Sequence, residues 1–404
     1  MNEVRCFHGD FTVNQHRKHI IQLIRVHGQV ARPFVAKAMD LSLPTVTNLV
    51  KGLLAESIIV EDGFGESQGG RPAALLKLNP DFAQAIGVEL SHAGVHAVLV
   101  DLGGNVLAST TAPIDPARPD ATMERAAGLV AKLIEGASRD RLKGIGVGVA
   151  GFVDRKRGVS TKFPHSEAWA NVEVAALLKA RFGLDVQVDN DVQAATLAEF
   201  RYGAARGVDS FLYFHVGHGI RLGMVVGGRL FHGAHGRAGE LGHIVVEDNG
   251  PLCYCGNNGC LESFASPRAI EGQAKEAMQK GVESSIATFA GGDASAVTID
   301  SVLAAAAAGD RLAVNIIERV GTHIGRVMAN LANLFDPSLF VLAGRLTASE
   351  SPLVESVDRA FRRIAMPAAR DTVEIRKTAF PEGACPRGAA TLVFDGMFEH
   401  LSLG

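Results

Sequence analysis

The sequence predicts an α/β protein in which an N-terminal winged helix-turn-helix precedes two similar lobes that enclose a cleft. Three short amphipathic helical segments and a strand–loop–strand pattern open the chain. Beyond residue 80 strands and helices alternate, which is typical of an α/β domain. A three-strand pattern that begins near Ala85 returns near Phe211 and indicates the two lobes. The length of 404 residues, at about 150 residues per domain, also predicts two or three domains.

The composition excludes several classes of protein. Hydrophobic residues make up 47% of the chain, too many for a disordered protein, yet no apolar run approaches the ~18 residues that span a bilayer. Residues 1–18 are polar and predict no secretory signal. The five cysteines are too few and too unevenly placed for a disulfide framework. We therefore expect a cytoplasmic protein without membrane association; the net charge of −3 by itself points to no polyanionic partner.

The first 55 residues predict three helices with a basic bias. Between residues 14 and 55 there are six basic residues and one acid, Asp40. Helices are expected at about residues 15–27, at about 32–39 and after an N-cap at Ser42. In the third helix, apolar residues recur at the spacing of a core-facing stripe; they are Val46, Leu49, Val50, Leu53 and Leu54. Its opposite face carries side chains suited to phosphates and base edges, namely Thr45, Thr47, Asn48 and Lys51.

A wing follows these helices. Strands are expected at residues 58–60 and 73–78, joined by a turn-rich loop at 61–70. Arg71 stands between Gly70 and Pro72, where it could enter a narrow minor groove, whose potential is most negative. The alternative is a small helical subdomain with a solvated basic face and an ordinary hairpin. The order of helices, polar face and wing favours DNA binding.

Asn79-Pro80 marks the expected start of the α/β part. Its strands are expected at residues 85–90, 94–101, 106–113, 144–152, 185–189, 211–216, 220–226, 229–231 and 340–343. Its helices are expected at residues 121–139, 172–181, 191–202 and 311–334.

One His and three Cys within eighteen residues predict a metal site. His243, Cys253, Cys255 and Cys260 supply the four nitrogen and sulfur ligands of a closed tetrahedral zinc site. Glycines between the cysteines let the loop fold back. With all four positions filled by protein, the Zn²⁺ would be structural. The alternative is a reduced cysteine-rich loop without metal.

The residues around this cluster resemble a known family. Gly242-His243, Cys253-x-Cys255-Gly256 and Gly259-Cys260-Leu261-Glu262 are similar to the signature of the ROK family of repressors, open reading frames and sugar kinases. The N-terminal part resembles that of the family's transcription factors, which include xylose repressors and regulators of glucose and N-acetylglucosamine uptake. The resemblance implies a DNA-binding domain at residues 1–80 and a two-lobed, actin-like (ribonuclease-H-like) sugar kinase fold at 81–404. Its small lobe would cover about 81–190 and its large lobe about 191–404, with the zinc loop at 243–260.

The resemblance also implies a sugar site. The family's Asn-Asp pair falls on Asn190-Asp191, its Glu-x-x-His run on Glu240 to His243, and its last carboxylate on Glu262. Such groups can hold vicinal hydroxyls, which donate and accept hydrogen bonds. His243 would bind zinc through one ring nitrogen and a sugar hydroxyl through the other. Taken singly, Asn190-Asp191 could instead cap the helix that follows, and Glu240 could be a surface residue.

The sequences of three loops distinguish a sugar kinase from a sugar sensor. Phosphoryl transfer needs glycine-rich loops whose backbone N–H groups approach ATP phosphates. The family's three kinase loops fall on Glu89-Leu90-Ser91-His92-Ala93, on Gly217 to Gly223, and on Ala343-Gly344-Arg345. Each lacks glycines that the kinases carry. His165 also replaces an Asn of the kinases, although Trp169 is kept. We therefore expect no enzymatic activity and no catalytic residue.

The sequence predicts a sugar-responsive transcriptional regulator, a repressor of carbohydrate uptake or catabolism genes. Its expected partners are operator DNA, a monosaccharide or sugar derivative, and further copies of itself in a homodimer or homotetramer. The alternative is a ROK-type kinase that phosphorylates a monosaccharide with ATP. A sensor that meets a regulatory protein instead of a sugar is a third reading.

Overall fold

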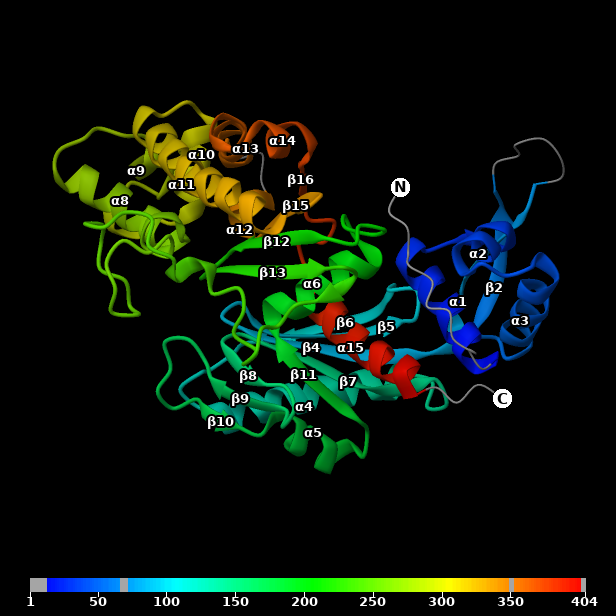
Figure 1. The fold of residues 1–404 in the computed structure, drawn as a ribbon. Coiled ribbons are helices and arrows are strands. Elements are labelled where there is room, and N and C mark those ends of the chain that lie inside the picture. Colours follow the sequence, from blue (N-terminus) through cyan, green and yellow to red (C-terminus); the bar gives the residue numbers. More distant parts are fainter. Residues whose placement is uncertain (1–12, 66–71, 349–351, 401–404) are drawn as a thin grey trace. The chain divides into compact units, whose positions relative to one another are not determined.

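The computed structural model describes residues 13–65, 72–348 and 352–400, and these form two compact units (Figure 1). The first comprises the described residues up to Gly207 together with those from Gly383 onward, and the second comprises Val208–Glu382. The last helix therefore returns to the first unit. The domain boundaries near residues 80 and 190 stay predictions.

The N-terminal elements of the first unit have the expected winged-helix order. The helices are α1 (Val13–His27), α2 (Arg32–Met39) and α3 (Leu43–Ala55), and the strands are β1 (Val30–Ala31), β2 (Ile59–Phe64) and β3 (Ala74–Leu78). Ser42 caps α3 by accepting a hydrogen bond from the Thr45 backbone N–H. The strands form a sheet of order β1-β3-β2. β1 was not predicted, because two residues carry no periodic signal.

One hydrophobic core joins these helices to the rest of the first unit. The predicted stripe of α3, except for the half-buried Leu54, is buried with Ile20 and Ile24 of α1. The same core contains Val98 and Val100 of the following sheet and Phe394 and Phe398 of the last helix. The winged helix is thus packed onto the first unit and is not tethered by a linker alone.

The main sheet of the first unit has five strands in the order β11-β7-β4-β5-β6. They are β4 (Gln84–Ser91), β5 (Gly94–Asp101), β6 (Val106–Ala112), β7 (Leu142–Val149) and β11 (Val186–Asn190). A smaller sheet contains β8 (Phe152–Asp154), β9 (Val159–Lys162) and β10 (Ala170–Val172). The remaining helices are η1 (Pro80–Phe82), α4 (Pro119–Gly136), α5 (Val174–Phe182), α6 (Asp191–Tyr202) and α15 (Ala384–His400).

The prediction of one strand over residues 144–152 is wrong. β7 ends at Val149, and Gly151 has a φ of +96° before β8 begins at Phe152. A Cβ at position 151 would lie 2.2 Å from the Lys162 carbonyl oxygen. This turn needs glycine, and it divides the apolar run between two sheets.

The second unit repeats the strand order of the first. Its sheet has the order β14-β13-β12-β15-β16, so that in both units a three-strand meander is extended by two parallel strands. The strands are β12 (Phe211–Val216), β13 (Ile220–Val226), β14 (Arg229–Leu230), β15 (Leu339–Ala343) and β16 (Glu374–Lys377). This repetition agrees with the two similar lobes that the sequence predicts.

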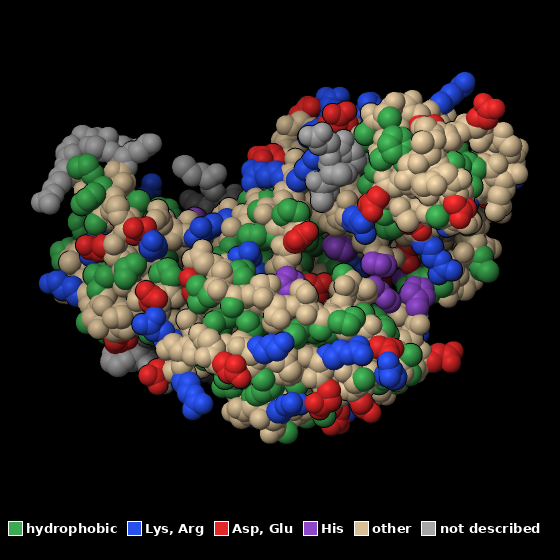
Figure 2. Space-filling view, turned by 180° about the vertical axis from the view of Figure 1, so that it is seen from behind, with side chains coloured by type: hydrophobic (Ala, Val, Ile, Leu, Met, Phe, Trp, Pro, Cys, Tyr) green, Lys and Arg blue, Asp and Glu red, His purple; other side chains and the backbone are tan. Residues whose placement is uncertain are grey.

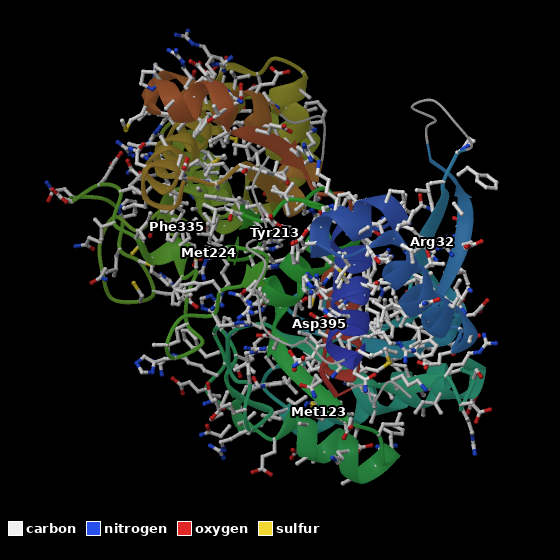
Figure 3. All side chains as sticks on the ribbon, turned by 45° about the vertical axis from the view of Figure 1, so that its right-hand side comes forward. Arg32, Met123, Tyr213, Met224, Phe335 and Asp395 are labelled. Carbon is white, nitrogen blue, oxygen red and sulfur yellow. The ribbon has the colours of Figure 1, made fainter. Side chains whose placement is uncertain are left out.

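Helices and short turns complete the second unit around its own core, which includes Met224 (Figure 3). They are η2 (Leu241–His243), α7 (Glu262–Ala265), α8 (Pro267–Gln279), α9 (Ile286–Phe289), η3 (Ala294–Ala296), α10 (Ile299–Ala307), α11 (Arg311–Phe335), α12 (Arg345–Ala348), α13 (Leu353–Ile364) and α14 (Pro367–Thr372). Among the described residues, none of the helices has the length and apolar character needed to cross a bilayer. Acidic and basic side chains are interspersed over the face shown in Figure 2.

Candidate metal centre and ligand site

The structure brings the four predicted metal ligands together in the second unit. The ligand atoms of His243, Cys253, Cys255 and Cys260 all lie within 4.8 Å of one another. Nδ1 of His243 is 3.6 Å from Sγ of Cys253, and Sγ of Cys255 is 3.6 Å from Sγ of Cys260. Tetrahedral bonds of zinc to sulfur and nitrogen place neighbouring ligands about 3.5–3.8 Å apart. The group therefore has the chemistry and spacing that a tetrahedral metal requires.

The loop geometry explains why these cysteines converge. The Cys253 N–H donates to the Asn257 carbonyl (2.8 Å), and the Gly256 N–H donates back to the Cys253 carbonyl (3.0 Å). Gly259 has a φ of +72°, and a Cβ there would lie 1.6 Å from the Glu247 carbonyl oxygen. Only glycine allows this close backbone approach, which returns Cys260 to the other ligands.

The thiols of the cluster differ in their acidity. Burial, together with the neighbouring Cys255 and Cys253, raises the pKa of the Cys260 thiol to about 12. A backbone hydrogen bond involving Asn257 lowers the pKa of Cys255. Metals bind thiolates, so occupation of this site would release protons, and metal affinity would rise with pH.

Next to the metal cluster lies a polar group that contains three of the predicted sugar residues. Glu240 forms an ion pair with Arg221 (Oε1 to Nη2, 2.7 Å), and Oε2 of Glu262 accepts a hydrogen bond from the Ile220 N–H (2.9 Å). His243 lies close enough to Glu240 and Arg221 to interact with their charges. The second unit thus brings Glu240, His243 and Glu262 near one another.

Tyr254 belongs to this group and was missed by the sequence analysis. Its hydroxyl lies 2.9 Å from Nε2 of His243, the nitrogen expected to meet a sugar hydroxyl. Burial and the charge of Glu262 raise the pKa of Tyr254, so its hydroxyl stays neutral. Its place in the sequence, between Cys253 and Cys255, could have indicated this, because a loop that brings these cysteines together also brings Tyr254 close to them. A ligand hydroxyl that binds Nε2 of His243 would either share this atom with the Tyr254 hydroxyl or displace that hydroxyl from it.

Asn190 and Asp191 lie in the first unit, where β11 passes into α6. Oδ1 of Asn190 accepts from the N–H groups of Val192 and Gln193, and its Nδ2 donates to the Gly151 carbonyl and to Oδ1 of Asp191. These bonds use the full capacity of the amide, so Asn190 acts as a helix cap and positions its neighbour. Asp191 is half-buried, and its Oδ2 has no hydrogen bond within the described part of the chain. Asp191 is the member of the pair with an oxygen available to a ligand.

Glu89, on the first kinase-like loop, lies near Asp191. Burial and the charge of Asp191 raise the pKa of Glu89 to about 7, against a hydrogen bond with Ser91 that lowers it. Between these two pKa values the Glu89 carboxyl is therefore protonated in the folded state and ionised in the unfolded state. The contribution of Glu89 to the free energy of unfolding falls as the pH rises from about 4.5 to about 7, and it is constant above that range.

Glu89→Gln is expected to remove this pH dependence. Because the side chain is partly exposed, we expect about 2 kcal/mol of relative stabilisation of the variant between pH 5 and pH 8, less than the full shift implies. Urea unfolding midpoints at both pH values measure it. Glu135→Gln, at an exposed glutamate of α4, is the matched control. Parallel pH profiles for the parent and Glu89→Gln would contradict the prediction.

The two arginines of the other kinase-like loops have carboxylate partners. Arg221 pairs with Glu240, and Arg345 pairs with Asp300 through Nε (3.1 Å) and Nη2. Gly344 has a φ of +100°, and a Cβ there would lie 2.2 Å from the Val216 carbonyl oxygen. That glycine is required by the backbone of the second unit, independently of any phosphate.

Trp169 is a core residue of the first unit. It is completely buried, packs on Phe163 with ring centroids 5.1 Å apart, and donates from Nε1 to Oγ of Ser160 (2.9 Å). His165 is exposed, with a φ of +56°. The retained Trp is thus explained by packing, while the histidine remains accessible.

The expected DNA-binding face of α3 is largely exposed. Thr45, Asn48 and Lys51 are exposed and Thr47 is half-buried. Thr47 donates from Oγ1 to the Leu43 carbonyl (2.8 Å), and the Thr45 hydroxyl lies 2.7 Å from that of Ser42. Both hydroxyls have local partners, which leaves Asn48 and Lys51 as the side chains free to extend. Arg71 lies outside the described residues.

Three of the six basic residues of the N-terminal segment pair with carboxylates. Arg17 is buried and pairs with Glu56 (2.5 Å), Arg25 pairs with Asp395 of α15, and Arg32 pairs with Glu61 (2.5 Å). Figure 3 labels Arg32 in the winged helix and Asp395 on the last helix. The local excess of positive charge in the sequence is therefore a poor guide to the charge of the expected DNA-binding face.

Residues 85–395 match the ROK family. Among curated proteins, the DNA-binding transcriptional dual regulator NagC of Escherichia coli is 32% identical over 389 residues, which cover 95% of this chain and 93% of the relative. The crystal structure of a ROK family transcriptional regulator, a homolog of the Escherichia coli Mlc protein, has a TM-score of 0.79 at 29% identity and covers 96% of this chain and 98% of its own. A ROK family glucokinase from Streptomyces griseus, solved with glucose and AMPPNP, has a TM-score of 0.69 at 30% identity. It covers 78% of this chain and 100% of its own. The similarity to regulators thus extends over more of the chain.

Proposed function

We propose, from the premise that this chain belongs to the ROK family, that it represses carbohydrate uptake or catabolism genes until a sugar releases it from operator DNA. Its class is that of its relatives, the ROK family DNA-binding transcriptional regulators with the two-lobed, actin-like sugar kinase fold. The identity of the sugar, the structural Zn²⁺, the contacting residues and the homodimer or homotetramer belong to the proposal. So does a cytoplasmic location, where operator DNA is found.

The observation that carries the proposal is the path of α6. This helix begins at Asp191, a proposed sugar ligand, and ends at Arg201 and Tyr202. Arg201 pairs with Asp395 (3.2 Å), the same carboxylate that pairs with Arg25 of α1. One twelve-residue helix therefore connects a proposed sugar ligand to a helix of the winged domain. A ligand that favours one position of α6 would also bias the DNA-binding helices.

In this proposal Zn²⁺, held by His243, Cys253, Cys255 and Cys260, is structural and fixes the polar group beside it. Glu240, His243, Glu262 and Asp191 would bind sugar hydroxyls, with Asn190 holding Asp191 in place. A regulatory protein in place of the sugar is the second candidate for the signal.

The DNA contacts are tested by substitutions on α3. Asn48→Ala is expected to weaken operator binding roughly tenfold and to relax base preference, because an amide can pair bidentately with adenine. Lys51→Ala should weaken binding to all sequences and reduce the salt slope by about one. Fluorescence anisotropy on operator and unrelated duplexes measures both. Lys143→Ala, at an exposed lysine in β7, is the control. Unchanged operator affinity in both α3 variants would contradict the assignment.

We expect no sugar kinase activity. Phosphates of ATP need close backbone N–H groups, and Ser91 and His92 put side chains where the kinases have glycine, while Ala93 lacks the hydroxyl of their threonine. A coupled assay of ADP release, run with several hexoses and pentoses, should give no rate above background. Turnover that disappears in Asp191→Asn would overturn this expectation in favour of the kinase, since that carboxylate would then be the base.

A further inference from the structure

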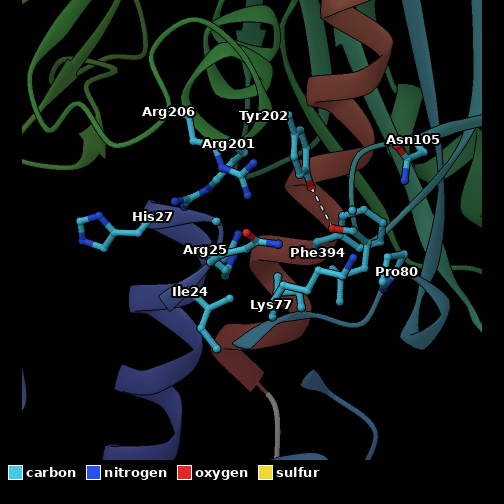
Figure 4. Close-up of a pocket in the computed structure, with 15 residues that line it drawn as sticks. Ile24, Arg25, His27, Lys77, Pro80, Asn105, Arg201, Tyr202, Arg206 and Phe394 are labelled. Carbon is cyan, nitrogen blue, oxygen red and sulfur yellow. Dashed lines mark hydrogen bonds between the residues drawn. The ribbon is translucent and has the colours of Figure 1, made fainter. Parts of the chain in front are cut away.

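The first unit contains a cavity that the proposed function does not use. It has a volume of about 290 Å³ and lies where α1, the end of α6 and the β3–η1 segment meet (Figure 4). Small-molecule sites are typically about 300–1,000 Å³, so this cavity suits a small ligand. Among the described residues that line it there is no acid, and four are cationic: Arg25, Lys77, Arg201 and Arg206.

Two of these cations are buried with too little negative charge. The side chains of Arg25 and Arg201 are 8% and 9% exposed, and both pair with one carboxylate, that of Asp395. Buried charges are costly unless each is paired and hydrogen-bonded. Burial and the nearby charge of Arg201 lower the pKa of Arg25 to about 9, although the charge of Glu399 opposes this shift.

Arg201 also has hydrogen-bonding capacity that the protein does not use. Its Nε and Nη1 atoms are buried and have no hydrogen-bond partner among the described residues. Buried guanidinium N–H groups without acceptors are rare. Because Arg201 lines the cavity, an acceptor placed there could satisfy them.

Arg206 provides a third guanidinium, from the segment that follows α6. It is exposed and has no carboxylate partner within the described residues. Its Nη2 lies over Gly28, where a Cβ would be only 2.0 Å away. Glycine at the end of α1 therefore lets this side chain lie across the junction, and Figure 4 shows Arg25, Arg201 and Arg206 directed toward the same space.

We propose that this cavity binds a small phosphate-bearing anion through Arg25, Arg201 and Arg206, and that the anion ties α1 of the winged helix to α6. A phosphate group offers several acceptor oxygens, and guanidinium forks match them in bidentate geometry. Lys77 is already paired with Asp62 (2.6 Å) and supplies long-range charge. Burial of Arg25 and Arg201 favours a small molecule over the backbone of duplex DNA, which reaches only exposed side chains.

The test is equilibrium dialysis of the full chain with radiolabelled inorganic phosphate at constant ionic strength. We expect saturable binding of one phosphate per chain and a rise in melting temperature that follows the same saturation curve. Glycerol 3-phosphate in a second arm distinguishes a phosphate ester from free phosphate, with glycerol and chloride as blanks. Equal stabilisation by chloride would mean general screening and would overturn the proposal.

Variants distinguish anion binding by these arginines from a purely structural role. Arg206→Gln removes an exposed side chain and should leave the fold intact while raising the phosphate Kd roughly tenfold. Arg201→Gln should abolish binding, and Arg139→Gln, at an exposed arginine of the same unit, should not change it. Binding that is unaffected by Arg206→Gln and Arg201→Gln would refute the site. Loss of operator affinity in Arg206→Gln without any phosphate binding by the parent would assign this arginine to the DNA backbone instead.

Discussion

Cys260→Ser is expected to abolish zinc binding and to lower the free energy of unfolding of the second unit by about 5 kcal/mol. Structural zinc contributes about 10–16 kcal/mol in isolated zinc-finger peptides, and part of this survives in a unit with its own core. The remaining ligands cannot close a tetrahedron, and the loop from Ile244 to Cys260 would lose the contacts that return it to η2. Metal analysis and urea unfolding of freshly purified protein measure the two effects.

The control for this experiment is Cys385→Ser. Cys385 is buried in the first unit and is not a member of the cluster, so this variant should keep one zinc per chain even where its stability falls. Parent protein that contains no zinc and whose cysteines at 253, 255 and 260 are freely alkylated would contradict the prediction.

Saturating sugar is expected to weaken operator binding of the parent by about 1–3 kcal/mol, roughly 5- to 150-fold. Glu262→Gln should abolish this response and leave operator affinity without sugar unchanged. Its amide oxygen can still accept the hydrogen bond of the Ile220 N–H, so the fold is retained while the carboxylate is lost. A thermal-shift screen of monosaccharides first identifies the sugar, because a ligand that binds only the folded state raises its melting temperature.

Operator titrations with and without that sugar then measure the coupling. Thermodynamic linkage requires operator DNA to weaken sugar binding by the same factor, which a sugar titration of the protein–DNA complex checks. Glu283→Gln, at an exposed glutamate of the same unit, should respond like the parent. Unchanged operator affinity at saturating sugar would favour a protein partner as the signal.

Elements with a clear periodic signal were predicted closely. α2 and α6 have the predicted bounds, and the meanders of both units lie where alternating apolar residues placed them. The short strands β8, β9, β10 and β16 were not predicted, because three or four residues do not establish a period. The convergence of His243 with the three cysteines was predictable because these residues are close in sequence and the glycines between them allow a tight loop.

Only the tertiary structure shows where the polar side chains point and which groups they pair with. Arg25 belongs to the basic segment that suggested DNA, yet it is buried against Asp395, a residue near the other end of the chain. Asn190 matches the sugar motif, yet the hydrogen bonds of its side-chain amide go to the start of α6 and to the turn at Gly151. Only the tertiary structure showed that Tyr254 contacts His243 and that Arg221 pairs with Glu240.

The sequence alone therefore determined the order of elements, the repeated lobes and the His/Cys group that could hold a metal, since each depends on spacing along the chain. Only the tertiary structure decided which charges are buried, which hydroxyls and amides are satisfied, and which cations share one carboxylate. The physical reason is that the cost of burying a polar group depends on partners brought by packing from distant segments, and local sequence carries no record of them.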